Sequence, residues 1–174
     1  IGKWHSTGPV YILADTAAVV VAAGATLELG NTTETIGPLS GAVGSTIDLN
    51  GNALTVNSIA DSTVAGVISG AGSITKIGAG VLTFSGANNY TGLTTVNGGT
   101  LLVNGSVNSN VLVNSLGALG GNGTINGNVT GTGTFSPGNS PGAMTINGNF
   151  TPAGIVNFEV NSGWTVAGTD FDQY

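Results

Sequence analysis

The eight carboxylates of this chain are the residues most capable of acid–base chemistry or metal binding. Glycosidase or lyase chemistry on a β-strand scaffold needs clustered carboxylates, and charge stabilisation by a basic partner. The chain has only two lysines, no arginine and one histidine, and its acids are scattered. They are Asp15, Glu28, Glu34, Asp48, Asp61, Glu159, Asp170 and Asp172. We therefore predict no catalytic residues and no enzymatic activity.

Two of these acids share a position in a repeated pattern. Glu28 lies in Thr-Leu-Glu-Leu and Asp48 in Thr-Ile-Asp-Leu, twenty residues later. If the flanking aliphatic residues point inward, both carboxylates stack one rung apart on an outer strand face. We interpret the pair as a solvated strand face, because neither acid has a neighbouring His or Arg; a catalytic pair is the alternative.

Aromatic and polar residues gather at both ends of the chain. Trp4 beside Lys3 and His5 could bind a sugar ring by stacking on the indole. The interpretation we favour is an N-terminal cap, in which Trp4 and Tyr11 cover the open end of the core. Near the C-terminus, Asp170 and Asp172 lie close to Trp164 and could ligate calcium. We favour a surface loop there, and predict no metal and no cofactor site.

The elements that must carry these residues are short strands. Between Gly70 and Gly98, apolar or turn-forming residues occupy nearly every second position, which is the period of an extended backbone. A unit of strand followed by a Gly or Asn corner recurs at a spacing of about twenty residues. Copies begin at Thr26, Thr46, Asn52, Thr100, Val111, Gly123 and Met144. This pattern predicts an all-β solenoid of about eight rungs, about 40 Å long.

Composition excludes several classes of protein. The apolar fraction of 40% and the net charge of only −6 argue against disorder, despite 31 glycines. The scarcity of basic residues argues against nucleic acid or anionic lipid as a partner. Because there is no cysteine, disulfides and thiolate metal sites cannot occur. The longest apolar run, 17–23, is too short to span a bilayer, so we expect no membrane insertion of this segment.

Residues 70–102 carry a family resemblance. Gly-Ala-Gly-Ser-Ile-Thr-Lys-Ile-Gly-Ala-Gly-Val-Leu-Thr-Phe-Ser-Gly, followed by Ala-Asn-Asn-Tyr-Thr-Gly and then Thr-Thr-Val, resembles the autotransporter-associated repeat of bacterial passenger domains. Residues 136–150 are similar to the proline-glycine tract that often follows this repeat. Leu93 stands where a second glycine is common. We expect the translocation machinery to be missing or to lie on another part of the chain.

The resemblance implies a right-handed parallel β-helix, exported across a Gram-negative-type envelope and displayed at the cell surface. It also implies a repeat that supports passenger folding and secretion. The chain begins at Ile1 without a leader, so we expect any export signal to have been removed. Residues 170–174 resemble the start of another rung.

The repeat contains four polar residues whose placement can be predicted. The even register puts Lys76 with the inward set, where an unpaired ammonium would be costly. We therefore expect the register to break at Gly78 and Gly80, so that the amine reaches water. We expect Tyr90 to plug a corner with its hydroxyl hydrogen-bonded. Asn88 and Asn89 are expected to make corner hydrogen bonds. The glycosylation-like matches, such as those at Asn31, Asn89 and Asn128, are expected by chance.

We expect one solenoid domain over 1–174, with a cap or first rung in 1–25, the repeat in 70–102, and the Pro-Gly tract with its following rung in 136–150. The predicted function is an extracellular structural or adhesive stalk. Two alternatives stay open: a subunit that stacks end to end into a fibre, and a β-helix that binds or processes polysaccharide. Possible partners are another copy, a host or matrix surface, or a polysaccharide.

Overall fold

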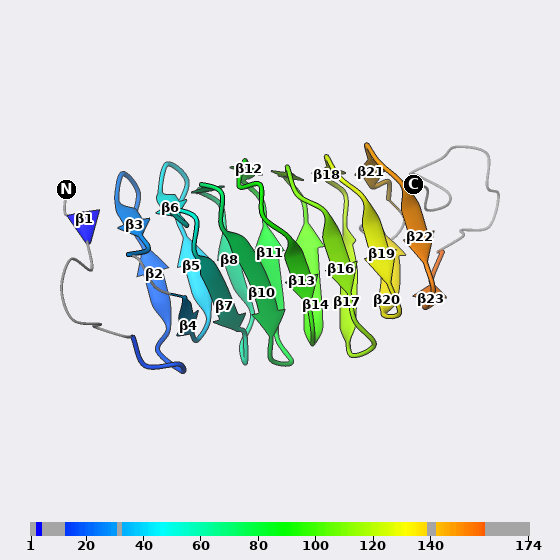
Figure 1. The fold of residues 1–174 in the computed structure, drawn as a ribbon, viewed down its shortest axis with the longest axis horizontal. Coiled ribbons are helices and arrows are strands. Elements are labelled where there is room, and N and C mark those ends of the chain that lie inside the picture. The colour runs from blue at the N-terminus through cyan, green and yellow to red at the C-terminus, as the bar shows by residue number, and fades with distance from the viewer. Residues whose placement is uncertain (1–2, 5–12, 31–32, 139–141, 159–174) are drawn as a thin grey trace.

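The computed structural model describes residues 3–4, 13–30, 33–138 and 142–158. In these residues all regular structure is β-strand. The strands wind into a rod of parallel sheets, and successive coils lie side by side along its length (Figure 1). The predicted all-β solenoid is confirmed, with about seven turns where about eight rungs were expected.

Each coil contributes one strand to each of three faces. The eight-stranded sheet consists of β2 (Val19–Val21), β5 (Leu39–Gly41), β8 (Ser62–Val64), β11 (Val81–Phe84), β14 (Gly99–Val103), β17 (Gly117–Gly121), β20 (Thr134–Pro137) and β23 (Ile155–Val156). The seven-stranded sheet consists of β4 (Glu34–Ile36), β7 (Ala53–Asn57), β10 (Ser73–Ile77), β13 (Thr94–Val96), β16 (Val111–Val113), β19 (Val129–Gly131) and β22 (Phe150–Pro152).

The third face is divided into two four-stranded sheets. The first contains β1 (Lys3–Trp4), β3 (Thr26–Glu28), β6 (Thr46–Asp48) and β9 (Val67–Ser69). The second contains β12 (Ala87–Asn88), β15 (Ser106–Val107), β18 (Thr124–Ile125) and β21 (Thr145–Ile146). The break falls between β9 and β12, which lie in consecutive coils but share no ladder of backbone hydrogen bonds.

Coil length changes at the same place in the chain. In the seven-stranded sheet, Leu54 pairs with Ile74 and Ile74 with Thr94, each twenty residues apart. After this point Thr94 pairs with Val111 and Val111 with Val129, at shorter separations. Residues 74–94 therefore lie where twenty-residue coils give way to shorter ones.

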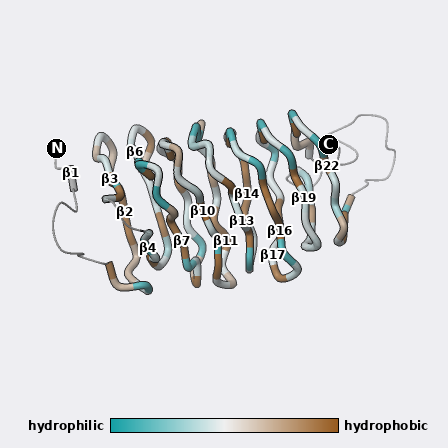
Figure 2. The backbone as a smooth tube through the Cα atoms, viewed as in Figure 1, coloured by the Kyte–Doolittle hydropathy of each residue, from teal (hydrophilic) through white to brown (hydrophobic). Residues whose placement is uncertain are grey.

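The core runs through the rod as one column of inward side chains. Strand burial alternates, as in Ala53–Asn57, where Leu54 and Val56 are buried and their neighbours are half-buried. Leu82, Phe84, Val96 and Leu101 are all buried, as predicted. Figure 2 shows apolar segments recurring along successive coils. Since a single coil has too little apolar surface to form its own core, each coil depends on its neighbours.

The predicted copies of the repeat unit do not all occupy equivalent places. Thr26 and Thr46 pair directly in the first four-stranded sheet. Thr100, which begins a similar Thr-Leu-Leu-Val-Asn-Gly unit, lies instead in the eight-stranded sheet. A strand ending in an Asn-Gly corner suits any of the three faces, because the local sequence specifies only strand and turn. The division of the chain into a cap, a repeat and a Pro-Gly rung stays a prediction.

Candidate functional site

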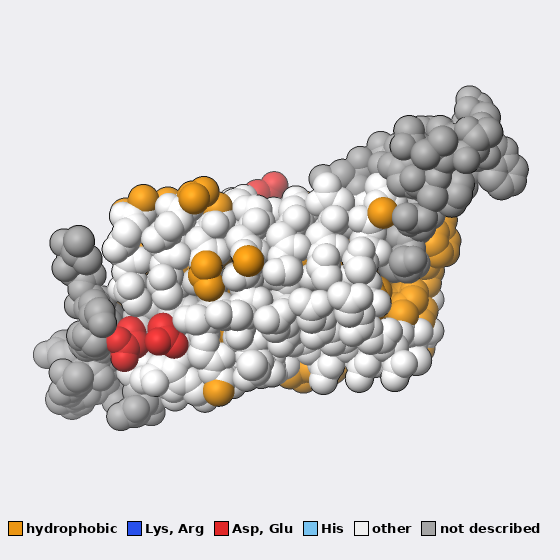
Figure 3. All heavy atoms as spheres, turned by 90° about the horizontal axis from the view of Figure 1, so that it is seen from above, with side chains coloured by type: hydrophobic (Ala, Val, Ile, Leu, Met, Phe, Trp, Pro, Cys, Tyr) orange, Lys and Arg blue, Asp and Glu red, His pale blue; other side chains and the backbone are white. Residues whose placement is uncertain are grey.

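The structure does not bring the carboxylates together into a catalytic or metal-binding cluster among the described residues. Glu28 and Asp48 pair across β3 and β6 and lie half-buried on the outer face. The residues before them in the two strands, Leu27 and Ile47, point inward and are buried in the core. This confirms the predicted stack. Figure 3 shows acidic side chains gathered near the N-terminal end of a surface that otherwise carries few charges. Across the described ranges, no group of three or more His, Asp or Glu side chains could hold a metal ion.

The remaining described acids are separated from that stack. Asp61 accepts a hydrogen bond from the Val81 amide at 2.8 Å and so caps a corner of the rod. Glu34 points inward from β4 and is only 9% exposed, which the sequence pattern did not single out. Burial raises the pKa of its carboxyl above the ordinary value, and Asp15 adds to that effect. A hydrogen bond from the Leu13 backbone acts in the opposite direction. Its Oε1 has no hydrogen-bond partner in the structure.

The candidate sites at the chain ends lie outside the described residues. This applies to His5 and Tyr11 in the predicted cap or sugar site, and to the side chains of Lys3 and Trp4. It also applies to Glu159, Trp164, Asp170 and Asp172 in the predicted loop or calcium site.

Lys76 corrects one prediction. The register does not break around it, since Lys76 pairs with Val56 on one side and Val96 on the other. Its side chain is fully buried rather than extended to water. The ammonium is nevertheless satisfied, because Nζ donates to the carbonyl oxygens of Ile77 (3.3 Å), Gly78 (3.0 Å) and Gly98 (2.9 Å). The acceptors are backbone carbonyls at a corner of the rod, and that of Ile77 also accepts a hydrogen bond from the Ser58 amide at 3.0 Å.

The amine of Lys76 is closely enclosed by the corner that joins β13 to β14. Gly99 has a φ of +62°, and a Cβ placed there would collide with the backbone carbonyl oxygens of Gly78 and Gly80 and lie 2.8 Å from Nζ. Only glycine therefore suits this position. Burial lowers the pKa of Lys76 to about 8, and the charge of Asp61 opposes that effect.

Asn88 joins the two halves of the third face. Its side chain is 1% exposed, and its Oδ1 accepts a hydrogen bond from the Ile68 amide in the preceding coil at 3.0 Å. Its Nδ2 donates to Gly86 and, in the following coil, to Ser106, both at 3.1 Å. A side-chain amide thus supplies hydrogen bonds where β9 and β12 form no ladder, beside a backbone bond of 2.9 Å from the Asn89 amide to the Ile68 carbonyl. The predicted corner role of Asn88 is confirmed.

Tyr90 closes the next corner. It is fully buried, and its hydroxyl lies 2.6 Å from Thr94 Oγ1, which lies 2.6 Å from Ser109 Oγ in the following coil. Ser109 donates onward to the carbonyl of Asn110 at 3.2 Å. Burial raises the pKa of Tyr90 to about 12, although its hydrogen bonds act in the opposite direction. The predicted hydrogen-bonded corner plug is confirmed, and its link to Ser109 is visible only in the structure.

We call Lys76, Asn88, Tyr90 and Thr94 the polar clamp. Its members act near the three corners of one coil, and each corner gains at least one buried side-chain hydrogen bond to a neighbouring coil. A buried polar group without a partner is costly, so these bonds strongly favour the correct stacking of this coil. The polar clamp can therefore fix the register between this coil and its neighbours. It contains no nucleophile with a base beside it.

Asparagine stacks continue the same principle on the outside of the later coils. Asn126 Nδ2 donates to Asn108 Oδ1 at 2.7 Å, and Asn147 Nδ2 donates to Asn126 Oδ1 at 2.8 Å. The sequence signal is the Asn-x-Asn motif at 108–110, 126–128 and 147–149, whose spacing matches these coils. The strand-and-corner pattern alone does not single this motif out.

Comparison with known families gives one match. The family model described as passenger-associated-transport-repeat matches residues 74–103, a span that contains the whole polar clamp. The predicted resemblance to the autotransporter passenger repeat is thus confirmed. No match to the chain is found among curated proteins or among solved structures. In the part of the chain that the structure describes, no helix is long and apolar enough to cross a membrane.

Proposed function

Because residues 74–103 are a passenger-associated transport repeat within a parallel β-solenoid, we propose that this chain is a stalk segment of an autotransporter-like surface protein. Its role is to extend and space an adhesive or other functional surface outside the cell, without catalysis. The observation that carries the proposal is the coincidence of the matched repeat with the polar clamp. A protein that crosses an envelope unfolded and folds outside benefits from one coil whose stacking is strongly specified.

The clamp suits this role because of what it specifies. Short strands with a period of two can slip in register, and glycine-rich corners restrain them weakly. Buried polar groups have few alternative partners, so a misplaced coil would leave Lys76 or Asn88 unsatisfied. We infer that the clamped coil acts as a template on which the later coils stack.

An export experiment tests this proposal. The chain is placed between a cleavable export signal and an outer-membrane barrel in a Gram-negative host, and surface display is measured by protease accessibility on intact cells. We expect display of the wild-type chain and reduced folded display of Asn88→Ala. The exposed neighbour provides the matched control, Asn89→Ala, which should behave as wild type. Equal display of both variants would contradict the role of the clamp.

The absence of catalysis is tested separately. Purified chain is incubated with a panel of plant and bacterial polysaccharides, and chain lengths are followed by gel filtration. We expect no change. Cleavage that is abolished by Asp48→Asn would overturn the structural interpretation.

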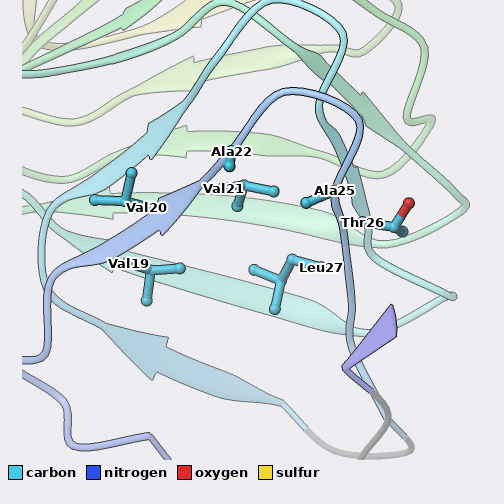
Figure 4. A pocket seen from close by; sticks show the side chains of 7 residues that line it. All are labelled: Val19, Val20, Val21, Ala22, Ala25, Thr26 and Leu27. Atoms are coloured by element: carbon cyan, nitrogen blue, oxygen red, sulfur yellow. The ribbon is translucent and has the colours of Figure 1, made fainter. Parts of the chain in front are cut away.

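End-to-end assembly is a second candidate, supported by apolar side chains at both ends of the rod. At one end, Val19, Val21 and Leu27 line a shallow groove of about 240 Å³, and Figure 4 shows Val21, Ala25 and Leu27 lying between β2 and β3. At the other, Ile155 is 62% exposed and Phe158 53% exposed. Such a head-to-tail contact need not close and would produce filaments. Light scattering over a concentration series tests it; a monomer at all concentrations rules it out.

A further inference from the structure

A single column of threonines follows the outer face of the seven-stranded sheet. Thr35 pairs with Thr55, Thr55 with Thr75, and Thr75 with Thr95. The register continues through one leucine and two further threonines. The complete column is Thr35, Thr55, Thr75, Thr95, Leu112, Thr130 and Thr151. Figure 1 shows the strands that carry it side by side along the rod.

In-register parallel pairing makes this column periodic. Equivalent atoms of successive threonines are separated by one strand spacing, about 4.8 Å. The β-branched side chain has few χ1 rotamers, so hydroxyl and methyl groups are held in repeating positions. Six of these seven residues are half-buried, which restricts them further, and Thr151 is exposed.

The face around the column carries no charge in its strands. The only Asp, Glu, Lys, Arg or His side chains in the seven strands are Glu34 and Lys76, and both point inward. The outward neighbours of the threonines in β7 and β10 are Ala53, Asn57, Ser73 and Ile77. Asn110 and Asn128 flank the later rungs with their amide oxygens bound to the next coil, at 2.8 and 2.9 Å.

These features restrict the kind of ligand. Sugar rings are commonly held by aromatic side chains, and none projects outward from the middle of these strands. Anionic ligands would need cations, which the face does not have. What the face offers is a regular, uncharged array of hydroxyl and methyl groups. We expect water molecules held between such groups to be ordered with the same period along the rod. Charged groups would instead impose tightly oriented hydration shells.

From this arrangement we propose that the outer face of the seven-stranded sheet binds the surface of ice. The oxygen rows of the ice lattice repeat at a spacing close to that of the rungs, so water ordered along the threonine column merges with the lattice. The methyl groups pack into the gaps between rows, and the release of less ordered water contributes to adsorption. This proposal is independent of export and of the polar clamp.

Ice-affinity uptake of the purified chain is the test. Labelled protein is placed in slowly grown ice, and the fraction incorporated is compared with that of a non-binding protein; crystal shape is observed in parallel. We expect incorporation and faceted crystals for the wild-type chain. Thr75→Lys and Thr95→Lys should each reduce incorporation to the non-binding level, because they place a hydrated charge within the array.

The opposite face supplies a matched control. Thr83 pairs with Thr63 on the outer face of the eight-stranded sheet, so Thr83→Lys makes the same chemical change in the same coil as Thr75 but on another face. It should incorporate as wild type does, and circular dichroism should show all variants folded. Exclusion of the wild-type chain from ice, or equal loss in the control, overturns the proposal. It is also overturned if Thr75→Lys leaves ice incorporation unchanged and instead prevents self-association of the chain in sedimentation or its binding to an insoluble polysaccharide.

Discussion

Lys76 and Gly98 lie in consecutive coils and are joined by a hydrogen bond of 2.9 Å from Nζ to the carbonyl oxygen. This bond ties the end of β10 to the corner before β14, and its donor is a fully buried cation without a carboxylate partner. Carbonyl dipoles thus take the place of a counter-ion. The arrangement makes Lys76 both a register lock and a source of pH dependence.

Lys76→Met is expected to alter how stability changes with pH. The folded pKa of about 8 lies below the ordinary lysine value of 10.5, so the unfolded chain binds more protons between these values. The wild-type free energy of unfolding should therefore rise from pH 7 to pH 10 through this group, by roughly 1–3 kcal/mol. Lys76→Met lacks this rise. Urea melts at each pH measure it, and parallel profiles for the two proteins would contradict the prediction.

Ionisation of Tyr90 is expected to lower the free energy of unfolding as pH rises above 10, opposite to the effect of Lys76. The folded pKa of Tyr90, about 12, lies above the ordinary tyrosine value of 10.0, so stability from this group is present below pH 10 and is lost as pH rises toward 12. Tyr90→Phe should abolish that loss. At neutral pH it should cost about 1 kcal/mol for the missing hydrogen bond. Because the chain has two other tyrosines, the difference in tyrosine absorbance between the wild type and Tyr90→Phe is followed with pH, beside urea melts. A difference signal that titrates near pH 10 would disprove the burial.

Leu101→Ala is expected to destabilise the chain by about 2–5 kcal/mol, since it removes a buried side chain and leaves a cavity. The neighbouring Leu102 is half-buried on the outer face and provides the control, Leu102→Ala, which should cost much less. Urea melts of both variants decide this. A cost for Leu101→Ala below about 0.5 kcal/mol would mean that the strand register is wrong.

Glu34→Gln is expected to stabilise the chain at neutral pH. The wild-type carboxyl has a raised pKa and an unpartnered Oε1, so burying its charge is unfavourable. A raised folded pKa contributes stability at low pH that is lost as pH rises through that pKa. The difference in stability between the wild type and Glu34→Gln should therefore vanish in acid, where both side chains are neutral. Thermal melts from pH 4 to pH 7 measure this; Glu28→Gln, on the outer face, is the control, and equal stabilisation by both would refute the explanation.

Much of the architecture could be predicted from the sequence, because solenoid structure is local and repeated. Alternation at Leu54–Val56 or Leu82–Phe84 already specifies strands and their inward face, and a spacing of about twenty residues specifies stacking. The outward stack of Glu28 on Asp48 and the buried hydroxyl of Tyr90 were predicted for the same reason. Both placements follow from the alternation of inward and outward side chains along a strand, and from a neighbouring coil of nearly equal length.

What the sequence alone determined is therefore the period, the inward face and the scarcity of basic side chains. Only the tertiary structure decided which face each similar unit occupies, where the third sheet breaks and how Lys76 is satisfied. The physical reason is that corners differ by a few residues in length, and these differences accumulate along the coil. Carbonyl groups of Gly78 and Gly98 come within reach of one amine only after two coils have stacked, which no local pattern of residues records.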